Sequence, residues 1–199
     1  MGQVFKTAEQ YLDQLNFGEF VEIGTSRGGD DGSTATLSKW TRGQKLITVD
    51  VDPVNCDFVR GLNLPNVEVI NAKGEDYLRQ RIYSMRPINF LYLDNFDWDW
   101  HPDKTEDFVR AQQDRYAELG LLMNNVNSQS AHLTQMILAL PHMATCSLVV
   151  CDDTWYNRWW GHYSGKSGSV VPFLLANGFE VLYTEEAPVY GTILGRGIV

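Results

Sequence analysis

Carboxylate side chains follow two apolar segments of the sequence, at the point where each segment ends. The run INFLYLD (88–94) ends in Asp94, and the run SLVVCD (147–152) ends in Asp152, which Asp153 follows. Both runs are apolar nearly throughout, which is typical of parallel strands covered on both faces. If the two strands are neighbours, their terminal acids lie about 5 Å apart at one edge of a sheet.

Carboxylates at that separation repel one another unless a cation or a shared proton lies between them. Oxygen ligands favour a hard cation such as Mg²⁺, whereas the four histidines and three cysteines of the chain show no spacing typical of a zinc site. We therefore predict a Mg²⁺ site formed by Asp94, Asp152 and Asp153. The alternative is that such acids cap the helices that follow, and for Asp99 we prefer that interpretation.

A glycine-rich segment, VEIGTSRGGDDGST (21–34), lies between a predicted strand and a predicted helix. Glycines there let the backbone approach a ligand, and the helix N-terminus offers unpaired N–H groups. Dinucleotide and S-adenosylmethionine sites both use such loops. A pyrophosphate is disfavoured here, because the acids Glu22, Asp30 and Asp31 lie beside the loop and the segment lacks the lysine of a Gly-Lys-Ser/Thr motif. The same acids favour the cationic S-adenosylmethionine. An ordinary tight turn with a solvated acidic tip is the alternative.

Asp50 ends a predicted strand, about 20 residues past the glycine loop, where an acid conventionally binds a ribose diol. Asp52 follows within VDVDP, so either acid fits this role. Asp52 also fits as a helix-capping residue before Pro53.

Aromatic residues follow both acidic strand ends, since five of the six tryptophans lie between positions 98 and 160. They fit the wall of a small-molecule pocket, and equally core packing or a dimer face.

His132 fits a general base or a further ligand, and equally a buried histidine within a helix. Lys166 lies in the loop segment SGKSGS near the pocket, and we expect it to be an exposed lysine.

These residues are positioned by an alternation of predicted strands and helices, which indicates a parallel sheet with helices on both faces. Ligands of such sheets bind at the carboxyl ends of the strands. Residues 153–168 are predicted as a loop. The predicted strands are 20–23, 46–50, 67–70, 88–94, 147–152, 179–184 and 190–195; the predicted helices are 5–15, one capped by Ser33 or Thr34 that ends at Trp40, one from about Glu75, 104–121, 127–142 and one that ends at Ala176.

Length and charge narrow the class of protein. The 199 residues suit a single domain, with a leading helix in 1–18 and a core in 19–199. A net charge of −9 disfavours nucleic-acid and anionic-membrane partners. Three cysteines without metal or redox spacing favour a reducing compartment, and we expect a cytoplasmic protein. Six tryptophans in a chain of this size suggest an apolar face to cover, so we expect a homodimer.

With these motifs assembled, the chain from Phe20 to Arg196 resembles the class I S-adenosylmethionine-dependent methyltransferases. Within them it is most similar to the small metal-dependent O-methyltransferases of the catechol and macrocin types. The resemblance implies a single Rossmann-like three-layer α/β/α domain with a seven-stranded, mostly parallel sheet whose last strand is antiparallel.

The resemblance also implies which residues contact the cofactor. The glycine loop would hold the methionine moiety, VDVDP would place the ribose on Asp50, and NAKGEDYL (71–78) would border the adenine. The implied cofactor-binding residues are Glu22, Gly24, Thr25, Ser26, Gly28, Ser33, Asp50, Val51, Ala72, Lys73, Gly74, Glu75 and Asp94.

The same resemblance completes the predicted metal site and raises the question of the base. FLYLDNF supplies Asp94, and VVCDDTW supplies Asp152 and Asp153. Catechol-type enzymes carry a catalytic lysine three residues after the fourth-strand aspartate, and this chain has Asp97 there. The predicted proton acceptor is therefore Asp97 or His132.

We accordingly predict an S-adenosylmethionine-dependent, Mg²⁺-assisted O-methyltransferase whose acceptor is a hydroxyl of a small molecule. One alternative is an enzyme that uses the same pocket for another reaction, hydroxylase-like or cofactor-cleaving. Another is a non-catalytic S-adenosylmethionine-binding protein. An NAD(P)-linked oxidoreductase is disfavoured by the acids beside the glycine loop.

Overall fold

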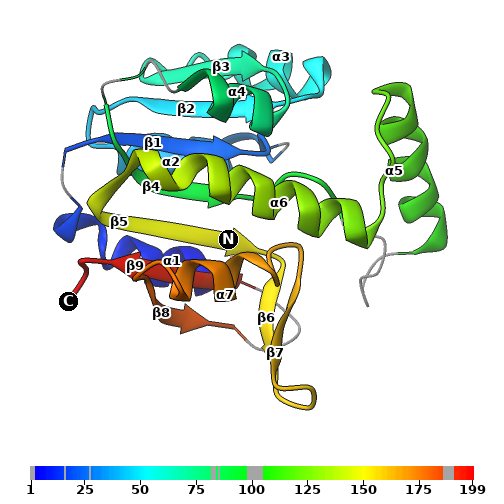
Figure 1. Ribbon diagram of the computed structural model, residues 1–199. Helices are drawn as coiled ribbons and strands as arrows, with labels where there is room; N and C mark the ends of the chain where they lie inside the picture. Colours follow the sequence, from blue (N-terminus) through cyan, green and yellow to red (C-terminus); the bar gives the residue numbers. More distant parts are fainter. Residues whose placement is uncertain are drawn as a thin grey trace.

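A computed structural model describes residues 3–15, 17–26, 28–81, 84, 86–97, 105–185 and 191–199. Its centre is a seven-stranded sheet with the strand order β3-β2-β1-β4-β5-β9-β8 (Figure 1). The strands are β1 Glu19–Ile23, β2 Leu46–Asp50, β3 Val67–Asn71, β4 Ile88–Leu93, β5 Met143–Asp152, β8 Glu180–Thr184 and β9 Gly191–Arg196.

The pairing of these strands confirms the predicted fold class. β1 pairs in parallel with β2 and β4, β2 with β3, and β4 with β5. β9, the last strand of the chain, runs antiparallel to both β5 and β8. All residues of β4 are buried, as expected for a central strand covered on both faces.

Helices cover both faces of the sheet. α1 and α2 contribute to an apolar core that includes Phe5, Leu37 and Phe90. α4, α6 and α7 contribute to a second core on the other face, which includes Leu78, Met136 and Leu174. The helices are α1 Gln3–Glu9, η1 Leu12–Gln14, η2 Gly29–Asp31, α2 Ser33–Trp40, α3 Pro53–Gly61, α4 Gly74–Gln80, α5 Glu106–Glu118, α6 Asn125–Ala139, η4 Leu140–His142 and α7 Val170–Leu175.

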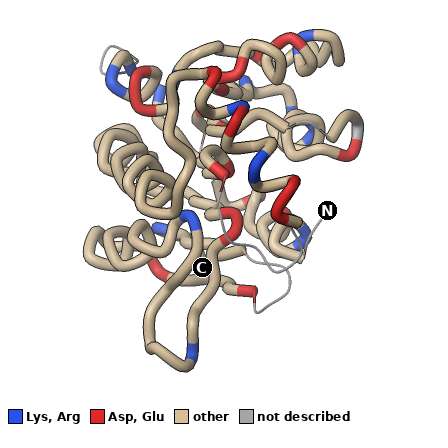
Figure 2. Tube along the Cα trace, turned by 90° about the vertical axis from the view of Figure 1, so that its right-hand side faces the viewer, with Lys and Arg blue, Asp and Glu red and all other residues tan. Residues whose placement is uncertain are grey.

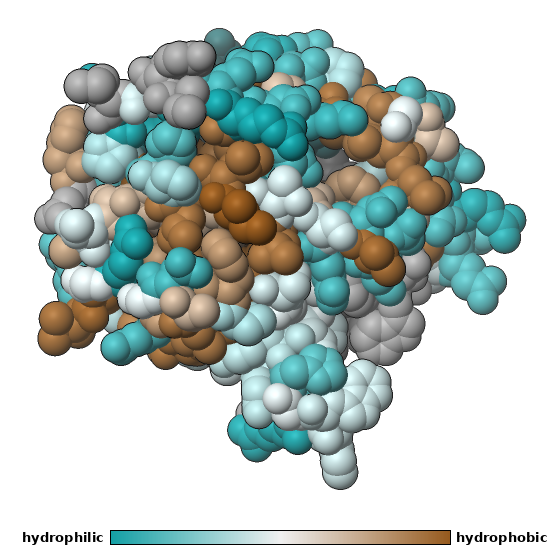
Figure 3. Space-filling model, in the orientation of Figure 1, coloured by the Kyte–Doolittle hydropathy of each residue, from teal (hydrophilic) through white to brown (hydrophobic). Residues whose placement is uncertain are grey.

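One prediction is wrong, because the expected loop 153–168 contains an antiparallel hairpin. β6 Thr154–Asn157 pairs with β7 His162–Gly165. The Tyr156 and Tyr163 rings meet across it at 5.1 Å between centroids. The hairpin projects from the body of the molecule (Figure 3). Its strands are too short for a periodic signal, so cross-strand pairing rather than sequence pattern defines them.

No helix within the described ranges has both the length and the apolar character needed to cross a membrane.

Candidate functional site

A pocket of about 510 Å³ lies at the carboxyl ends of β1, β2 and β4. Figure 2 faces this edge of the sheet and shows acidic positions gathered near its middle, with basic positions beside them. All but two of the predicted cofactor-binding residues line the pocket; Glu22 and Gly28 do not. The lining members of the predicted set are Gly24, Thr25, Ser26, Ser33, Asp50, Val51, Ala72, Lys73, Gly74, Glu75 and Asp94.

Gly24 lets the loop after β1 pack directly against the loop after β4. Its φ is +100°, a conformation that L side chains rarely adopt. A Cβ at this position would lie 2.5 Å from the backbone nitrogen of Asn95. The glycine therefore allows a close backbone approach that forms the floor between two strand ends.

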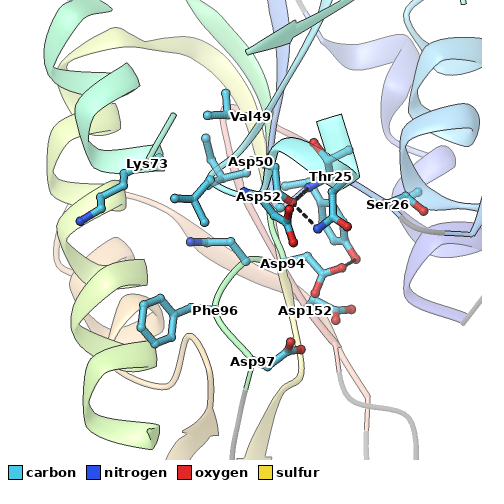
Figure 4. Close-up of a pocket in the computed structure, with 18 of the residues that line it drawn as sticks. Thr25, Ser26, Val49, Asp50, Asp52, Lys73, Asp94, Phe96, Asp97 and Asp152 are labelled. Atoms are coloured by element: carbon cyan, nitrogen blue, oxygen red, sulfur yellow. Dashed lines mark hydrogen bonds between the residues drawn. The ribbon is translucent and has the colours of Figure 1, made fainter. Parts of the chain in front are cut away.

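Asp50 is held rigidly at the pocket edge. Its carboxylate accepts hydrogen bonds from the backbone N–H of Thr25 (3.0 Å) and Asp52 (2.7 Å), and from the side chain of Asn55 (3.2 Å), as Figure 4 shows in part. Burial raises the pKa of Asp50, and these hydrogen bonds oppose that shift.

Asp52, the other acid that fits the ribose role, is occupied elsewhere. It caps α3 by accepting from the backbone N–H of Val54 at 2.8 Å. Its two oxygens also accept from Arg115 Nε (2.8 Å) and Nη2 (2.6 Å). The capping alternative for Asp52 is confirmed, so Asp50 is the better candidate for a ligand diol.

Glu22 is buried beneath the glycine loop, which it stabilises, and it does not line the pocket. Its buried carboxylate accepts hydrogen bonds from Ser33 Oγ (2.5 Å), Thr34 Oγ1 (2.6 Å) and Thr48 Oγ1 (2.6 Å). Burial raises the pKa of Glu22 to about 7. The prediction that Ser33 or Thr34 caps α2 is wrong, because Gly32 is the N-cap residue of this helix. The hydroxyl groups of Ser33 and Thr34 donate to Glu22 instead.

α5 closes one side of the pocket without a buried residue of its own, and it stands apart from the sheet in Figure 1. Besides the Arg115–Asp52 ion pair, the Tyr116 hydroxyl accepts a hydrogen bond from the backbone N–H of Asp97 at 2.7 Å. The Tyr116 ring packs edge-on against Phe96, with centroids 5.1 Å apart. The sequence carries no signal for these contacts, because the partners lie in different elements.

The acidic strand ends meet as predicted, and a lysine lies among them. Lys166 Nζ is 2.9 Å from Asp94 Oδ1, 3.0 Å from Asp153 Oδ2 and 3.8 Å from Asp152 Oδ2. The Asp94 and Asp152 carboxylates also lie close together (Figure 4). The expectation that Lys166 is exposed is wrong, because its side chain is only 3% exposed.

This arrangement does not fit the predicted Mg²⁺ site. The ammonium group lies where the ion is expected, between the same three carboxylates. Within the part of the chain that the structure describes, no group of three or more His, Cys, Asp or Glu side chains is arranged to hold a metal ion. We therefore derive no chemical step through a metal.

Protonation in this cluster is uneven. Burial, together with the charges of Asp94 and Asp153, raises the pKa of Asp152 well above its usual range. Burial alone would raise the pKa of Asp94, but the Lys166 charge and hydrogen bonds from Asp152, Lys166 and Tyr92 lower it overall. The pKa values of the two neighbouring carboxyl groups are therefore shifted in opposite directions, and Asp152 takes up a proton more readily than Asp94.

His132 is fully buried and does not line the pocket. Nε2 lies 2.5 Å from the carbonyl oxygen of Asn95, and Nδ1 lies 2.6 Å from Ser167 Oγ. Since a carbonyl oxygen only accepts, Nε2 carries the hydrogen and Nδ1 accepts from the serine. Burial lowers the pKa of His132 to about 4. The predicted role of general base does not fit this geometry, whereas Asp97 does line the pocket.

The tryptophans that the structure describes do not line the main pocket, although Trp155 and Trp160 line a second one. Trp159 and Trp160 lie at the tip of the β6–β7 hairpin and are 94% and 74% exposed. Trp155 lines a second hollow of about 590 Å³, between the hairpin and α6. Trp98 and Trp100 lie outside the described residues, as do Asp99 and the predicted start of the helix at 104. The described aromatic residues of the main pocket are Phe5, Tyr92, Phe96 and Tyr116.

Solved structures share this arrangement of strands and helices. A Streptococcus mutans protein, SMU.1697c, assigned as a methyltransferase and solved in complex with SAH, is 13% identical, with a TM-score of 0.61 over 100% of this chain and 99% of its own. An O-methyltransferase from Bacillus cereus in complex with SAH is 14% identical, with a TM-score of 0.57 over 98% and 79% of the two chains. This is the fold of the class I methyltransferases.

The acceptors named for proteins of this fold differ. An rRNA methylase from Streptococcus thermophilus is 11% identical to this chain, with a TM-score of 0.54 over 98% of both chains. No protein-family model and no curated protein sequence matches this chain. At these identities the likeness shows the shared fold, and the activity has to be argued from the site.

Proposed function

We propose that this protein is an S-adenosylmethionine-dependent methyltransferase that methylates a hydroxyl group of a small molecule. The observation that carries the proposal is the Asp50 carboxylate, which three hydrogen bonds hold at the end of β2 beside the glycine loop. A carboxylate in this place is suited to bind the two hydroxyls of a ribose.

The rest of the pocket supports the same cofactor. Gly24, Thr25 and Ser26 provide a backbone surface for the methionine moiety, and Ala72 and Gly74 border the space beyond Asp50 that suits the adenine. Carboxyl groups outnumber cationic groups in the lining. Such a lining favours the sulfonium and ammonium of S-adenosylmethionine and disfavours the pyrophosphate of a dinucleotide.

The transfer itself requires little bond chemistry from the protein. The acceptor oxygen attacks the methyl carbon, an O–C bond forms as the C–S bond breaks, and the bonding pair stays on sulfur to leave neutral S-adenosylhomocysteine. Asp97 is the proposed acceptor of the hydroxyl proton: it lines the pocket next to Asn95 and Phe96, whereas Asp50, Asp52, Asp94 and Asp152 have the other contacts described above. Holding the oxygen in line with the sulfonium methyl provides the rate enhancement.

The choice of a small hydroxylated acceptor over RNA rests on charge. The net charge of −9 opposes the approach of a phosphate backbone. The pocket volume, about 510 Å³, falls within the range typical of small-molecule sites, about 300–1,000 Å³.

Calorimetric titration tests the cofactor assignment. We expect S-adenosylmethionine and S-adenosylhomocysteine to bind with micromolar Kd, of order −8 kcal/mol, and NADH not to bind. Asp50→Ala should weaken both by about tenfold or more, whereas Asp57→Ala, an exposed acid on α3, should not. NADH binding without S-adenosylmethionine binding would overturn the proposal.

Product analysis then tests the reaction. With a panel of hydroxylated small molecules, we expect S-adenosylhomocysteine together with an acceptor heavier by one methylene unit. Consumption of S-adenosylmethionine without S-adenosylhomocysteine would instead identify a cofactor-cleaving enzyme.

A further inference from the structure

We propose that Lys166 is the resident cation of the acidic cluster and replaces a divalent metal ion there, so that this protein positions the carboxylates of Asp94, Asp152 and Asp153 without a metal. The inference deepens the proposed function and rests on it for the reaction that the cluster serves. Lys166 is a positioning residue in this account, because Asp94 and Asp152 line the pocket and Lys166 does not.

The ammonium group of Lys166 occupies the position between the three carboxylates. Nζ lies within 3.0 Å of oxygens from both Asp94 and Asp153, and 3.8 Å from Asp152. The carboxylates come from the ends of two neighbouring strands, β4 and β5. An ion bound by the same three oxygens would overlap the ammonium, so the two cations exclude each other.

The backbone around Lys166 is fixed by close contacts and hydrogen bonds. Gly165 has φ +93°, and a Cβ there would lie 1.8 Å from the carbonyl oxygen of Asp153. The backbone N–H of Lys166 donates to that same oxygen at 3.0 Å. The backbone N–H of Ser167 donates to Thr154 Oγ1 at 3.1 Å. The hairpin therefore closes Lys166 back onto the acids at its base.

A third contact fixes the far side of this segment. Ser167 Oγ bonds His132 Nδ1, and His132 Nε2 bonds the carbonyl oxygen of Asn95, the residue after Asp94. Lys166 is thus connected to the loop after β4 through a buried chain of hydrogen bonds. The ammonium itself contacts acids at the ends of both strands, so displacing the side chain would break ion pairs at β4 and at β5.

Charge points the same way. The Lys166 ammonium lies among the three carboxyl groups, within 3.0 Å of Asp94 and Asp153 and 3.8 Å from Asp152. The chain itself therefore supplies positive charge where a metal ion would supply it.

Mn²⁺ is the probe for the test, because its binding is seen by electron paramagnetic resonance without any turnover. We expect wild-type protein to bind Mn²⁺ at this site more weakly than about 1 mM. Lys166→Met leaves three carboxylates without their cation, and we expect it to bind one Mn²⁺ at least about tenfold more tightly than the wild type. Lys39→Met, a substitution of an exposed lysine on α2, should behave as the wild type.

Stability and activity provide the second readout. Mn²⁺ should raise the thermal midpoint of Lys166→Met and leave that of the wild type unchanged. EDTA should leave wild-type methyl transfer unchanged, and Lys166→Met should lose about tenfold or more of it. If Lys166→Met does not fold, Lys166→Gln provides the same comparison, because it keeps a hydrogen-bond donor and removes the charge.

Two results would overturn the inference. One is stoichiometric Mn²⁺ binding by the wild type that Asp152→Asn abolishes, because Lys166 would then yield its place to an ion. The other is a folded Lys166→Met or Lys166→Gln that binds no Mn²⁺. Either result leaves the cofactor titration intact, so failure of this inference is distinguishable from failure of the proposed function.

Discussion

The two halves of the pocket are built in different ways. The half at the ends of β1 and β2 is held mainly by short-range contacts, since Asp50 is bonded by Asp52 and Asn55, two and five residues away, and by Thr25 of the glycine loop, 25 residues away. The half at the ends of β4 and β5 depends on distant partners. Lys166 is 72 residues from Asp94 in the chain, and His132 is 37 from Asn95.

This difference suggests different responses to mutation. The half at the ends of β1 and β2, which is the proposed cofactor half, should lose ligand affinity when a substitution breaks a local backbone requirement. The other half should keep its structure. The half at the ends of β4 and β5, which is the proposed acceptor half, should change its geometry when residues far from the pocket are substituted. Buried hydrogen bonds and the Lys166 ammonium connect its parts. The substitutions below test that contrast, from the largest expected effect to the smallest.

Gly24→Ala should have the largest effect on cofactor binding. The added Cβ would meet the backbone of Asn95 at 2.5 Å, at a φ of +100°. We expect S-adenosylmethionine affinity to fall about 100-fold, equivalent to about 3 kcal/mol, measured by calorimetry. Gly29→Ala is the matched control, because Gly29 also has positive φ but a Cβ there would meet open space. Equal losses in the two variants would show that backbone conformation alone matters.

His132 should make stability depend on pH in the acid range. Its folded pKa is about 4 against an ordinary 6.5, so below pH 6.5 the unfolded state binds a proton that the folded state does not. The free energy of unfolding therefore does not depend on His132 protonation above pH 6.5. It falls as the pH is lowered toward 4, by about 3 kcal/mol in all.

Urea unfolding at pH 7 and pH 4.5 measures this contribution. The wild type should lose more free energy of unfolding between the two pH values than His132→Asn does, because the variant has no proton to gain. His162→Asn, at an exposed position of the hairpin, is the control and should keep the wild-type difference. An unchanged difference in His132→Asn would contradict the buried neutral histidine.

Arg115→Gln should have a smaller effect, limited to cofactor release. It removes the two hydrogen bonds to Asp52 that hold α5 over the pocket. We expect the dissociation rate of S-adenosylmethionine to rise about three- to tenfold, measured by stopped flow. The thermal midpoint should change little, because α5 buries no residue. Arg110→Gln on the same helix, an exposed position, is the control.

Trp159→Ser should have the smallest effect. The ring is 94% exposed at the hairpin tip and does not line the main pocket. We expect cofactor affinity to stay constant and the free energy of unfolding to change by less than about 0.5 kcal/mol. A rise in KM for an identified acceptor, at constant cofactor affinity, would instead assign the hairpin to the acceptor side.

The sequence by itself determined the order and type of most elements and the edge of the sheet at which the acidic residues meet. Apolar strands such as INFLYL and the glycine loop carry local, periodic signals, and the carboxyl ends of parallel strands necessarily meet at one edge. Asp50, Asp94 and Asp152 could therefore be predicted to converge, and the structure places all three in the pocket lining.

Only the tertiary structure decided which cation meets the acids and what each polar side chain does. Lys166 looks like a surface residue in the sequence and is buried among carboxylates in the fold. Asp52 binds Arg115 from another element, and His132 connects two loops. These roles depend on partners tens of residues away. The free energy of a buried charge is set by those partners and by its distance from water, neither of which local sequence pattern records.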